Sequence, residues 1–238
     1  MCSSDLDGFV ANRSRIPFNL EQGLMIEEGA LPQQIDKVME GFGYPVGPFK
    51  VNDMSGMDVS YDTRKRRAAA NPNYRGLPIT DAIVEAGRLG QKTGAGWYRY
   101  EAGRRDALAD PVVDDIIATE RRTLGIKPRK LTDTEIVDRL LYALTNEGAA
   151  LLGEGIAQRA SDIDVVYLAG YGFPVYRGGP MFHAQQQGLF NVVRRMQEFA
   201  ANPHGDPKFW RPAPLLLRAA AAGSFDAATA KRPRRSRS

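Results

Sequence analysis

A turn of the form Gly-aromatic-Pro-Val occurs twice in this chain, about 130 residues apart. It reads GFGYPVGP at 41–48 and GYGFPVYRGGP at 170–180. A motif this long is repeated by chance only rarely, and the text before each copy is similar as well. Self-similarity on this scale indicates duplicated structure. The repeat is therefore the feature that most constrains the fold.

The residues before each turn extend the match. Each copy has two glutamates seven residues apart, a glycine after the second glutamate, and then an Ile-Asp pair. These residues are Glu21, Glu28, Gly29, Ile35 and Asp36 in the first copy and Glu147, Glu154, Gly155, Ile163 and Asp164 in the second. We predict two copies of a long helix, a turn, a short helix and a Gly-Pro loop, packed against each other as in a homodimer. The alternative is a chance likeness of helical hairpins.

Helical patterns account for most of the chain. Ile16, Leu20 and Leu24 recur every fourth residue, several segments have proline in a first helical turn, and TDTE at 132–135 has the form of a capping box. Ser161 is expected to cap a helix. The predicted helices cover 9–29, 32–40, 48–69, 78–88, a short segment from Pro111, a long segment from the capping box to about 158, 162–169, 180–187, 189–201 and 213–222.

The predicted fold class is all-α, with two tandem related helical domains. Only 90–101, rich in glycine and aromatic residues, suggests a short extended segment. The predicted boundaries are a first helical domain at 7–101, a linker with a short helix at 102–131, a second helical repeat at 132–225 and a basic disordered tail at 226–238.

The charge of the chain is uneven. The net charge is +4, but the ending KRPRRSRS holds five basic residues, and the other 27 Lys and Arg balance 28 Asp and Glu. We expect this tail to be solvated, with a polyanion-binding arm as the alternative, so nucleic acid is an unlikely partner. No apolar run reaches the roughly 18 residues of a membrane span. The single cysteine, Cys2, excludes an internal disulfide and favours a reducing compartment, which we take to be the cytoplasm.

Common catalytic and metal motifs fail on spacing. GRLGQKT at 87–93 does not meet the phosphate-loop pattern, and DMSGM at 53–57 lacks the first glycine of a nucleophile elbow. One cysteine and two distant histidines, His183 and His204, do not form a standard zinc site. We therefore predict no metal ligand and no cofactor-binding residue, and we expect His183 and the four repeated glutamates to be structural.

Longer motifs point to a family. They are GFVANR (8–13), EEGALPQQID (27–36), FGYPVGPFKVNDMSGMDV (42–59), GRLGQKTGAGWYRYE (87–101), NEGAALLGEGIAQRASDID (146–164), GYGFPVYRGGPM (170–181) and FWRPAPLL (209–216). The first four resemble the C-terminal helical domain of 3-hydroxyacyl-CoA dehydrogenases. The last three resemble its second copy in multifunctional fatty-acid β-oxidation proteins, which fuse an enoyl-CoA hydratase part to a dehydrogenase part. The resemblance implies a fold like the C-terminal domain of 6-phosphogluconate dehydrogenase, with the second copy where a dimer partner would pack.

The resemblance also implies site residues. Family members oxidise the C3 hydroxyl of an acyl-CoA to a ketone, and the asparagine of GFVANR hydrogen-bonds near the catalytic histidine and the substrate oxygen. Asn12 matches this asparagine, so we predict that it is catalytic and substrate-binding. Pro45 and Val51 would line the acyl pocket. From the residues alone, a cap of the first helix is the favoured role for Asn12, and Pro45 and Val51 could be core residues.

Other parts that the resemblance implies are missing from this sequence. The NAD-binding Rossmann domain, its catalytic His and Glu, and the hydratase part have no counterpart here, since no glycine-rich dinucleotide fingerprint follows a strand. We expect NAD and acyl-CoA to act in the complete enzyme and the chain alone to be inactive. The alternative is a non-catalytic helical scaffold that pairs with a separate NAD domain or a thiolase.

Overall fold

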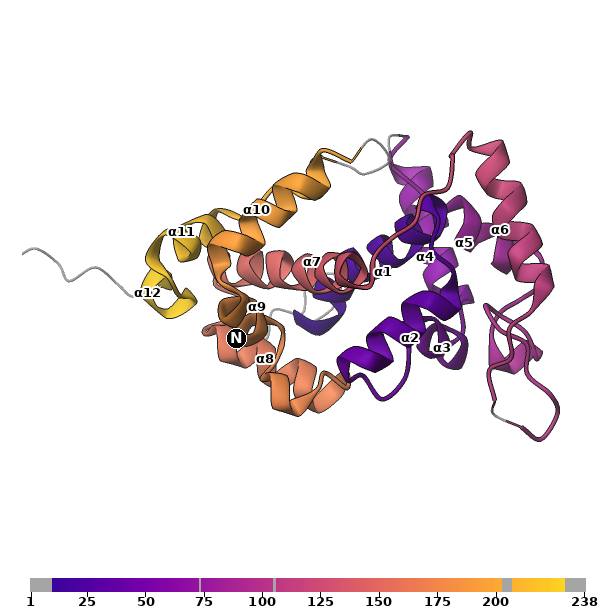
Figure 1. The fold of residues 1–238 in the computed structure, drawn as a ribbon, viewed down its shortest axis with the longest axis horizontal. Coiled ribbons are helices and arrows are strands. Elements are labelled where there is room, and N and C mark those ends of the chain that lie inside the picture. The colour runs from indigo at the N-terminus through magenta and orange to yellow at the C-terminus, as the bar shows by residue number, and fades with distance from the viewer. Residues whose placement is uncertain (1–9, 73, 105, 203–206, 230–238) are drawn as a thin grey trace, which may run out of the picture. The chain divides into compact units, whose positions relative to one another are not determined.

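The computed structural model describes residues 10–72, 74–104, 106–202 and 207–229, and these residues form an all-α fold, as predicted (Figure 1). The helices are α1 (Val10–Glu28), α2 (Pro32–Phe42), α3 (Pro48–Ser55), α4 (Asp58–Ala70), α5 (Pro78–Glu85), α6 (Pro111–Thr123), α7 (Asp133–Gly153), α8 (Ala160–Gly170), α9 (Pro180–Gln187), α10 (Leu189–Ala200), α11 (Pro214–Ala222) and α12 (Phe225–Thr229). Two short 3-10 turns, η1 (Gln91–Thr93) and η2 (Val175–Arg177), complete this part of the chain.

Most helices lie close to their predicted ranges, but two predictions of helix length were wrong. The segment 48–69 is not one helix: it is α3 and α4, divided at Gly56, whose φ of 82° is incompatible with a continuing helix. The long helix α7 does not reach 158 but ends at Gly153, two residues before Gly155 turns the chain with a φ of 75°.

Of two predicted caps, one is wrong and one is confirmed. Ser161 does not cap α8, which begins one residue earlier, at Ala160; the N–H of the preceding Arg159 donates to Asp162 at 2.9 Å. The Thr132 hydroxyl does accept the N–H of Glu135 at 3.2 Å, as predicted. The Glu135 carboxylate also pairs with the guanidinium of Arg129.

The segment 90–101 contains a 3-10 turn and isolated bridges instead of a strand. The bridges join Gly90 to Ala95, Ala95 to Arg99, and Arg99 to Leu108. Asp53 on α3 fixes this segment, because its buried carboxylate accepts the N–H groups of Trp97 and Tyr98 at 2.9 Å each and the hydroxyl of Tyr100 at 2.9 Å. Trp97 then packs edge-on against Phe49 in the core.

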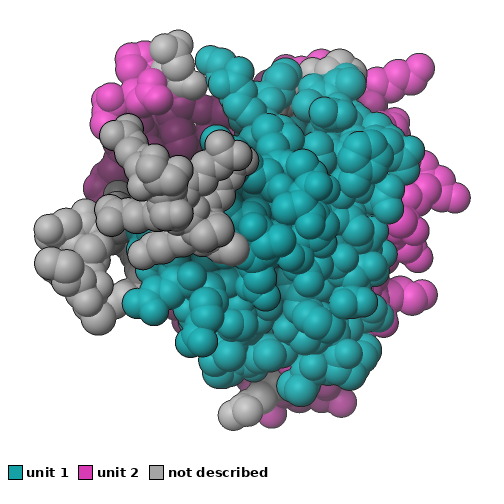
Figure 2. Space-filling view, turned by 90° about the vertical axis from the view of Figure 1, so that its left-hand side faces the viewer, with its two compact units in different colours: residues 1–19, 138–238 teal, residues 20–137 magenta. Residues whose placement is uncertain are grey.

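The described chain forms two compact units, coloured separately in Figure 2. One unit comprises residues up to Asn19 and from Asp138 onward, and the other comprises Leu20–Val137. The divisions fall inside α1 and α7, so each unit holds one repeat together with the first part of the other repeat's long helix. The domain boundaries drawn from the sequence stay a prediction.

Each unit has an apolar core of its own. In the unit that contains the second repeat, Leu140, Ile163, Met181, Val192 and Leu216 are completely buried. In the other unit, Met25, Ile26, Ile35, Met39 and Ile83 are completely buried. Both cores take residues from a long helix and from the short helix after it, which is the arrangement that the repeat predicts.

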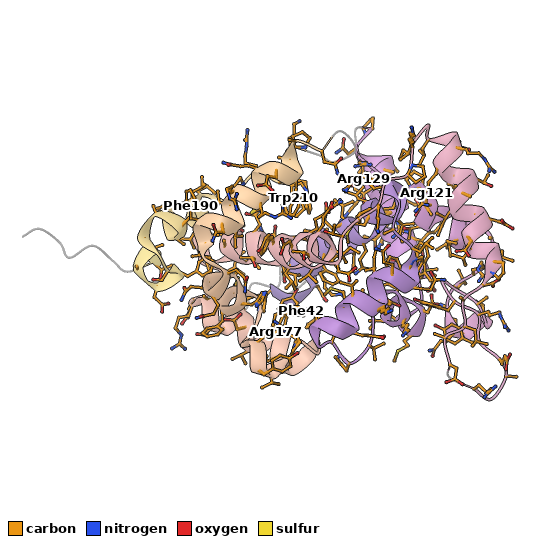
Figure 3. The ribbon with its side chains drawn as sticks, in the orientation of Figure 1. Phe42, Arg121, Arg129, Arg177, Phe190 and Trp210 are labelled. Carbon is orange, nitrogen blue, oxygen red and sulfur yellow. The ribbon has the colours of Figure 1, made fainter. Side chains whose placement is uncertain are left out.

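The segment between the repeats does more than connect them. Arg121 on α6 donates to the carbonyls of Ile26 and Ala30, and so satisfies the last turn of α1 (Figure 3). The N–H of Arg129 donates to the carbonyl of Glu28 at 2.8 Å, and its guanidinium bonds the Glu28 carboxylate at 2.6 Å and also that of Glu135. Burial lowers the pKa of Arg121.

The C-terminal part departs from the predicted tail at its start. Helix α12 takes up 226–229, and the basic residues at 231–238 lie outside the described residues. Within the part of the chain that the structure describes, no helix is both long and apolar enough to cross a membrane.

Candidate functional site

The predicted site residue Asn12 lies inside α1, close to its first described residue, and its side chain is exposed. Its Oδ1 atom accepts a hydrogen bond from the hydroxyl of Tyr171 at 3.2 Å. Tyr171 directly follows the last residue of α8, so the partner of Asn12 comes from the second repeat. The amide group is therefore tied to a side chain far away in the sequence, and its Nδ2 hydrogens remain as donors.

Around Asn12, the start of α1 is fixed by a cluster of aromatic and hydroxyl groups. Ser14 is fully buried; its hydroxyl donates to the carbonyl of Val10 at 2.7 Å and lies 2.9 Å from the hydroxyl of Tyr167. The rings of Tyr167 and Tyr171 are 5.2 Å apart, and the Arg15 guanidinium lies 5.5 Å from the Tyr171 ring centre. Burial raises the pKa of Tyr167 to about 12, so this phenol stays protonated.

An ion-pair network holds the next residue of α1. Arg13 donates through Nε to Glu147 at 2.6 Å and through Nη2 to Glu154 at 2.8 Å, and its Nη1 pairs with the other oxygen of Glu154. The hydrogen bond to Glu154 raises the pKa of Arg13, and the same bond lowers the pKa of Glu154. The two glutamates of the second repeat thus have a structural role, as predicted, and they fix the helical turn that carries Asn12.

The second repeat has a different residue at the position of Asn12. Because Glu21 and Glu147 correspond, Asn12 corresponds to Asp138 and Arg13 to Arg139. Asp138 accepts from Nε of Arg195 at 3.2 Å, and its side chain is only 17% exposed. The second copy therefore has a charged, ion-paired group where the first has an exposed neutral amide.

Pro45 and Val51 lie in the other unit. Pro45 is exposed in the turn between α2 and α3, and Val51 is half-buried on α3. Since these residues and Asn12 belong to different units, their grouping in one acyl pocket stays a prediction.

No histidine of the described residues belongs to the cluster of Asn12, Ser14, Tyr167 and Tyr171. His183 lies on α9, half-buried, with its ring centre 6.5 Å from that of Phe173, and burial lowers its pKa. His204 lies outside the described residues. No group of His, Cys, Asp and Glu in the described ranges is arranged to hold a metal ion.

A cavity of about 350 Å³ lies near this end of α1, but Asn12 does not line it. Its walls include Pro17, Glu147 and Trp210, the last of which is labelled in Figure 3. Asn146 also lines it, and its amide donates to the carbonyl of Arg211 at 3.1 Å and accepts the N–H of Ala213 at 2.8 Å. Asn146 on α7 thus hydrogen-bonds the backbone of the FWRPAPLL motif at two positions.

The sequence motif points to Asn12, which stays a predicted site residue, but no sequence signal points to its contact with Tyr171 or to the ion pair of Asp138. Tyr171 stands in the repeated turn motif, where the pattern itself requires no particular role for its ring. When the alignment of the repeated glutamates is extended toward the N-terminus, Asp138 becomes the counterpart of Asn12.

Comparison with known proteins gives consistent results. Residues 8–100 and 136–235 match the family described as "3-hydroxyacyl-CoA dehydrogenase, C-terminal domain". The chain is 43% identical over 230 residues to the peroxisomal bifunctional enzyme of Danio rerio, covering 91% of this chain and 32% of that protein. It is 36% identical over 205 residues to the fatty acid oxidation complex subunit alpha of Acinetobacter baumannii (strain SDF), covering 83% of this chain and 28% of that protein.

A solved structure has a similar fold. The dehydrogenase part of multifunctional enzyme 1 from C. elegans matches with a TM-score of 0.68 and 30% identity, covering 87% of this chain and 46% of that one. The chain spans about a third of the length of the curated relatives it matches.

Proposed function

Because the chain belongs to the family of 3-hydroxyacyl-CoA dehydrogenase C-terminal domains, we propose that it is the substrate-side helical half of an NAD-dependent dehydrogenase of fatty-acid β-oxidation. Joined to an NAD-binding part, it would contribute to the oxidation of 3-hydroxyacyl-CoA to 3-oxoacyl-CoA. The exposed, oriented amide of Asn12 carries this proposal. Cytoplasmic location remains a prediction, and the relative from Danio rerio is peroxisomal by its name.

The described residues do not fit NAD. A dinucleotide fold places the pyrophosphate at a glycine-rich turn between a strand and a helix, and the described ranges contain helices and isolated bridges only. We therefore assign no step through NAD to this chain. NAD would be held by the part that the longer relatives possess.

Asn12 would act on the substrate oxygen. With Oδ1 bonded to Tyr171, its Nδ2 hydrogens are the groups left to donate to the C3 oxygen of a 3-hydroxyacyl-CoA. A neutral amide cannot take the hydroxyl proton at neutral pH, so its role is to orient the oxygen while a base outside this chain removes the proton. Pro45, in the turn between α2 and α3, and Val51, on α3, would contact the acyl chain.

The proposal is tested by reconstitution. The chain is mixed with a separately produced NAD-binding part of a relative, and NADH formation from 3-hydroxyacyl-CoA is followed. We expect activity from the mixture, none from the chain alone, and a fall in kcat of about 10²-fold or more in Asn12→Ala, as for loss of an oxyanion-type donor. Asn191→Ala, which removes another exposed amide of the same unit, is the control.

Two results would contradict the proposal. NADH formation by the chain alone would show that the proposed division of labour is wrong. A wild-type mixture that associates without activity would favour the alternative of a non-catalytic scaffold, for which a thiolase is the next partner to test.

A further inference from the structure

The hydrogen bond between Tyr171 and Asn12 has a directional consequence. An asparagine amide is planar, so fixing Oδ1 also fixes the directions of the two Nδ2 hydrogens. Asn12 is exposed, and an exposed asparagine would otherwise sample several rotamers. A donor contributes most to a reaction when its direction is set before the substrate binds.

Tyr171 is itself held in place. Its ring stacks at a tilt on buried Tyr167, and the Arg15 guanidinium lies over its ring. Its N–H donates to the carbonyl of Tyr167 at 3.2 Å, and the N–H of Phe173 donates to the same carbonyl. Ring, backbone and neighbouring cation thus fix the phenol, so that it can direct the amide of Asn12.

We infer that Tyr171 is the positioning residue for Asn12, an inference that rests on the function proposed for Asn12. The second repeat would then support the active site of the first. In the second repeat the counterpart of Asn12 is Asp138, which forms an ion pair with Arg195. The two glutamates of the second repeat bind Arg13 and so hold the start of α1. Tyr171, from the turn motif of the same repeat, directs the amide of Asn12.

The first test needs no activity. In the full chain labelled with nitrogen-15, the Asn12 side-chain amide gives two proton resonances, assigned by their loss in Asn12→Ser. Tyr171→Phe removes one hydroxyl and keeps the ring. We expect it to shift both resonances and speed their exchange with water, whereas Tyr176→Phe, in the same loop with an exposed ring, leaves them in place. Unchanged Asn12 resonances in Tyr171→Phe would overturn the inference.

The second test uses the reconstituted enzyme. Loss of one orienting hydrogen bond is expected to lower kcat about fivefold in Tyr171→Phe and to leave KM unchanged. In the Asn12→Ala background the same change should have no further effect. A loss of equal size in that background would overturn the inference. If the wild-type mixture is inactive, the proposed function fails, and the amide resonances still decide the role of Tyr171.

Discussion

Asp36 and Asp164 make the same contact in the two repeats. Asp36 accepts the N–H of Phe49 at 2.8 Å, and Asp164 accepts the N–H of Met181 at 2.7 Å. Both carboxylates are buried, and both cap a helix, α3 or α9, that opens with a Gly-Pro pair. The repeated Ile-Asp pair and the repeated Gly-Pro loop are therefore the two ends of one structural contact.

Removing either carboxylate should destabilise its unit. In Asp36→Ala the N–H groups of Phe49 and Lys50 and the hydroxyl of Tyr98 lose their acceptor, so we expect a loss of about 3 kcal/mol. Asp164→Ala leaves two N–H groups without their acceptor and should cost about 2 kcal/mol. Urea unfolding followed by circular dichroism measures both.

The control for these caps is Asp62→Ala, on the exposed side of α4. It should change the free energy of unfolding by less than about 0.5 kcal/mol. Losses as small as this in Asp36→Ala would mean that the buried carboxylate does not stabilise α3.

The stability should depend on pH through a buried glutamate. Burial raises the pKa of Glu27 from 4.5 to about 7, although its carboxylate pairs with Arg75. The folded state therefore binds the proton more tightly than the unfolded state, so the contribution of Glu27 is fully present below pH 4.5 and is lost as pH rises through 7. We expect Glu27→Gln to remove a decline of about 3 kcal/mol over this window.

Urea unfolding at a series of pH values tests this prediction. The wild-type free energy of unfolding should fall relative to that of Glu27→Gln as pH rises from 4.5 to 7. Asp115→Asn, at an exposed position of α6, is the control and should run parallel to the wild type. A constant difference between wild type and Glu27→Gln would contradict the raised pKa.

The ion pairs of Arg13 should be coupled energetically. A double-mutant cycle with Arg13→Met and Glu154→Gln is expected to give a coupling of about 1 kcal/mol, because the pair is bidentate and partly shielded from water. The exposed pair of Lys65 and Glu85 should give a clearly smaller coupling in the matching cycle, because solvent screens it. Equal couplings in the two cycles would show that the Arg13 pairs do not specifically fix the start of α1.

The fold could be predicted from the sequence because its signals are local. Proline in the first turn marks α2, α3, α5, α6, α9 and α11, and the repeat supplied the order of the elements. The division of α3 from α4 is not evident in the sequence, because a single glycine within a helical pattern, such as Gly56, does not by itself end a helix. The positive φ of that residue is a property of the folded chain.

The surroundings of the site could not be predicted in the same way. Tyr171 and Asn12 are 159 positions apart, and Arg121 is 95 positions from Ile26, so no local pattern links either pair. An exposed polar residue such as Asn12 also adds nothing to the periodic pattern of apolar residues along a helix. Asn12 was found through a family motif, while its partner depends on how the two repeats pack.

The glycines of the two Gly-Pro pairs leave no room for a side chain. A Cβ on Gly47 would lie 2.3 Å from Cγ of Asp36, and one on Gly179 would lie 2.4 Å from Cβ of Asp164. Gly47 has a φ of −65°, so Gly47→Ala should cost about 2 kcal/mol from the clash alone. Gly179 has a φ of 100°, so Gly179→Ala should cost about 1 kcal/mol more. Gly41→Ala, on α2 with nothing within 4 Å, should stabilise slightly, and unfolding midpoints that do not follow this order would contradict the steric account.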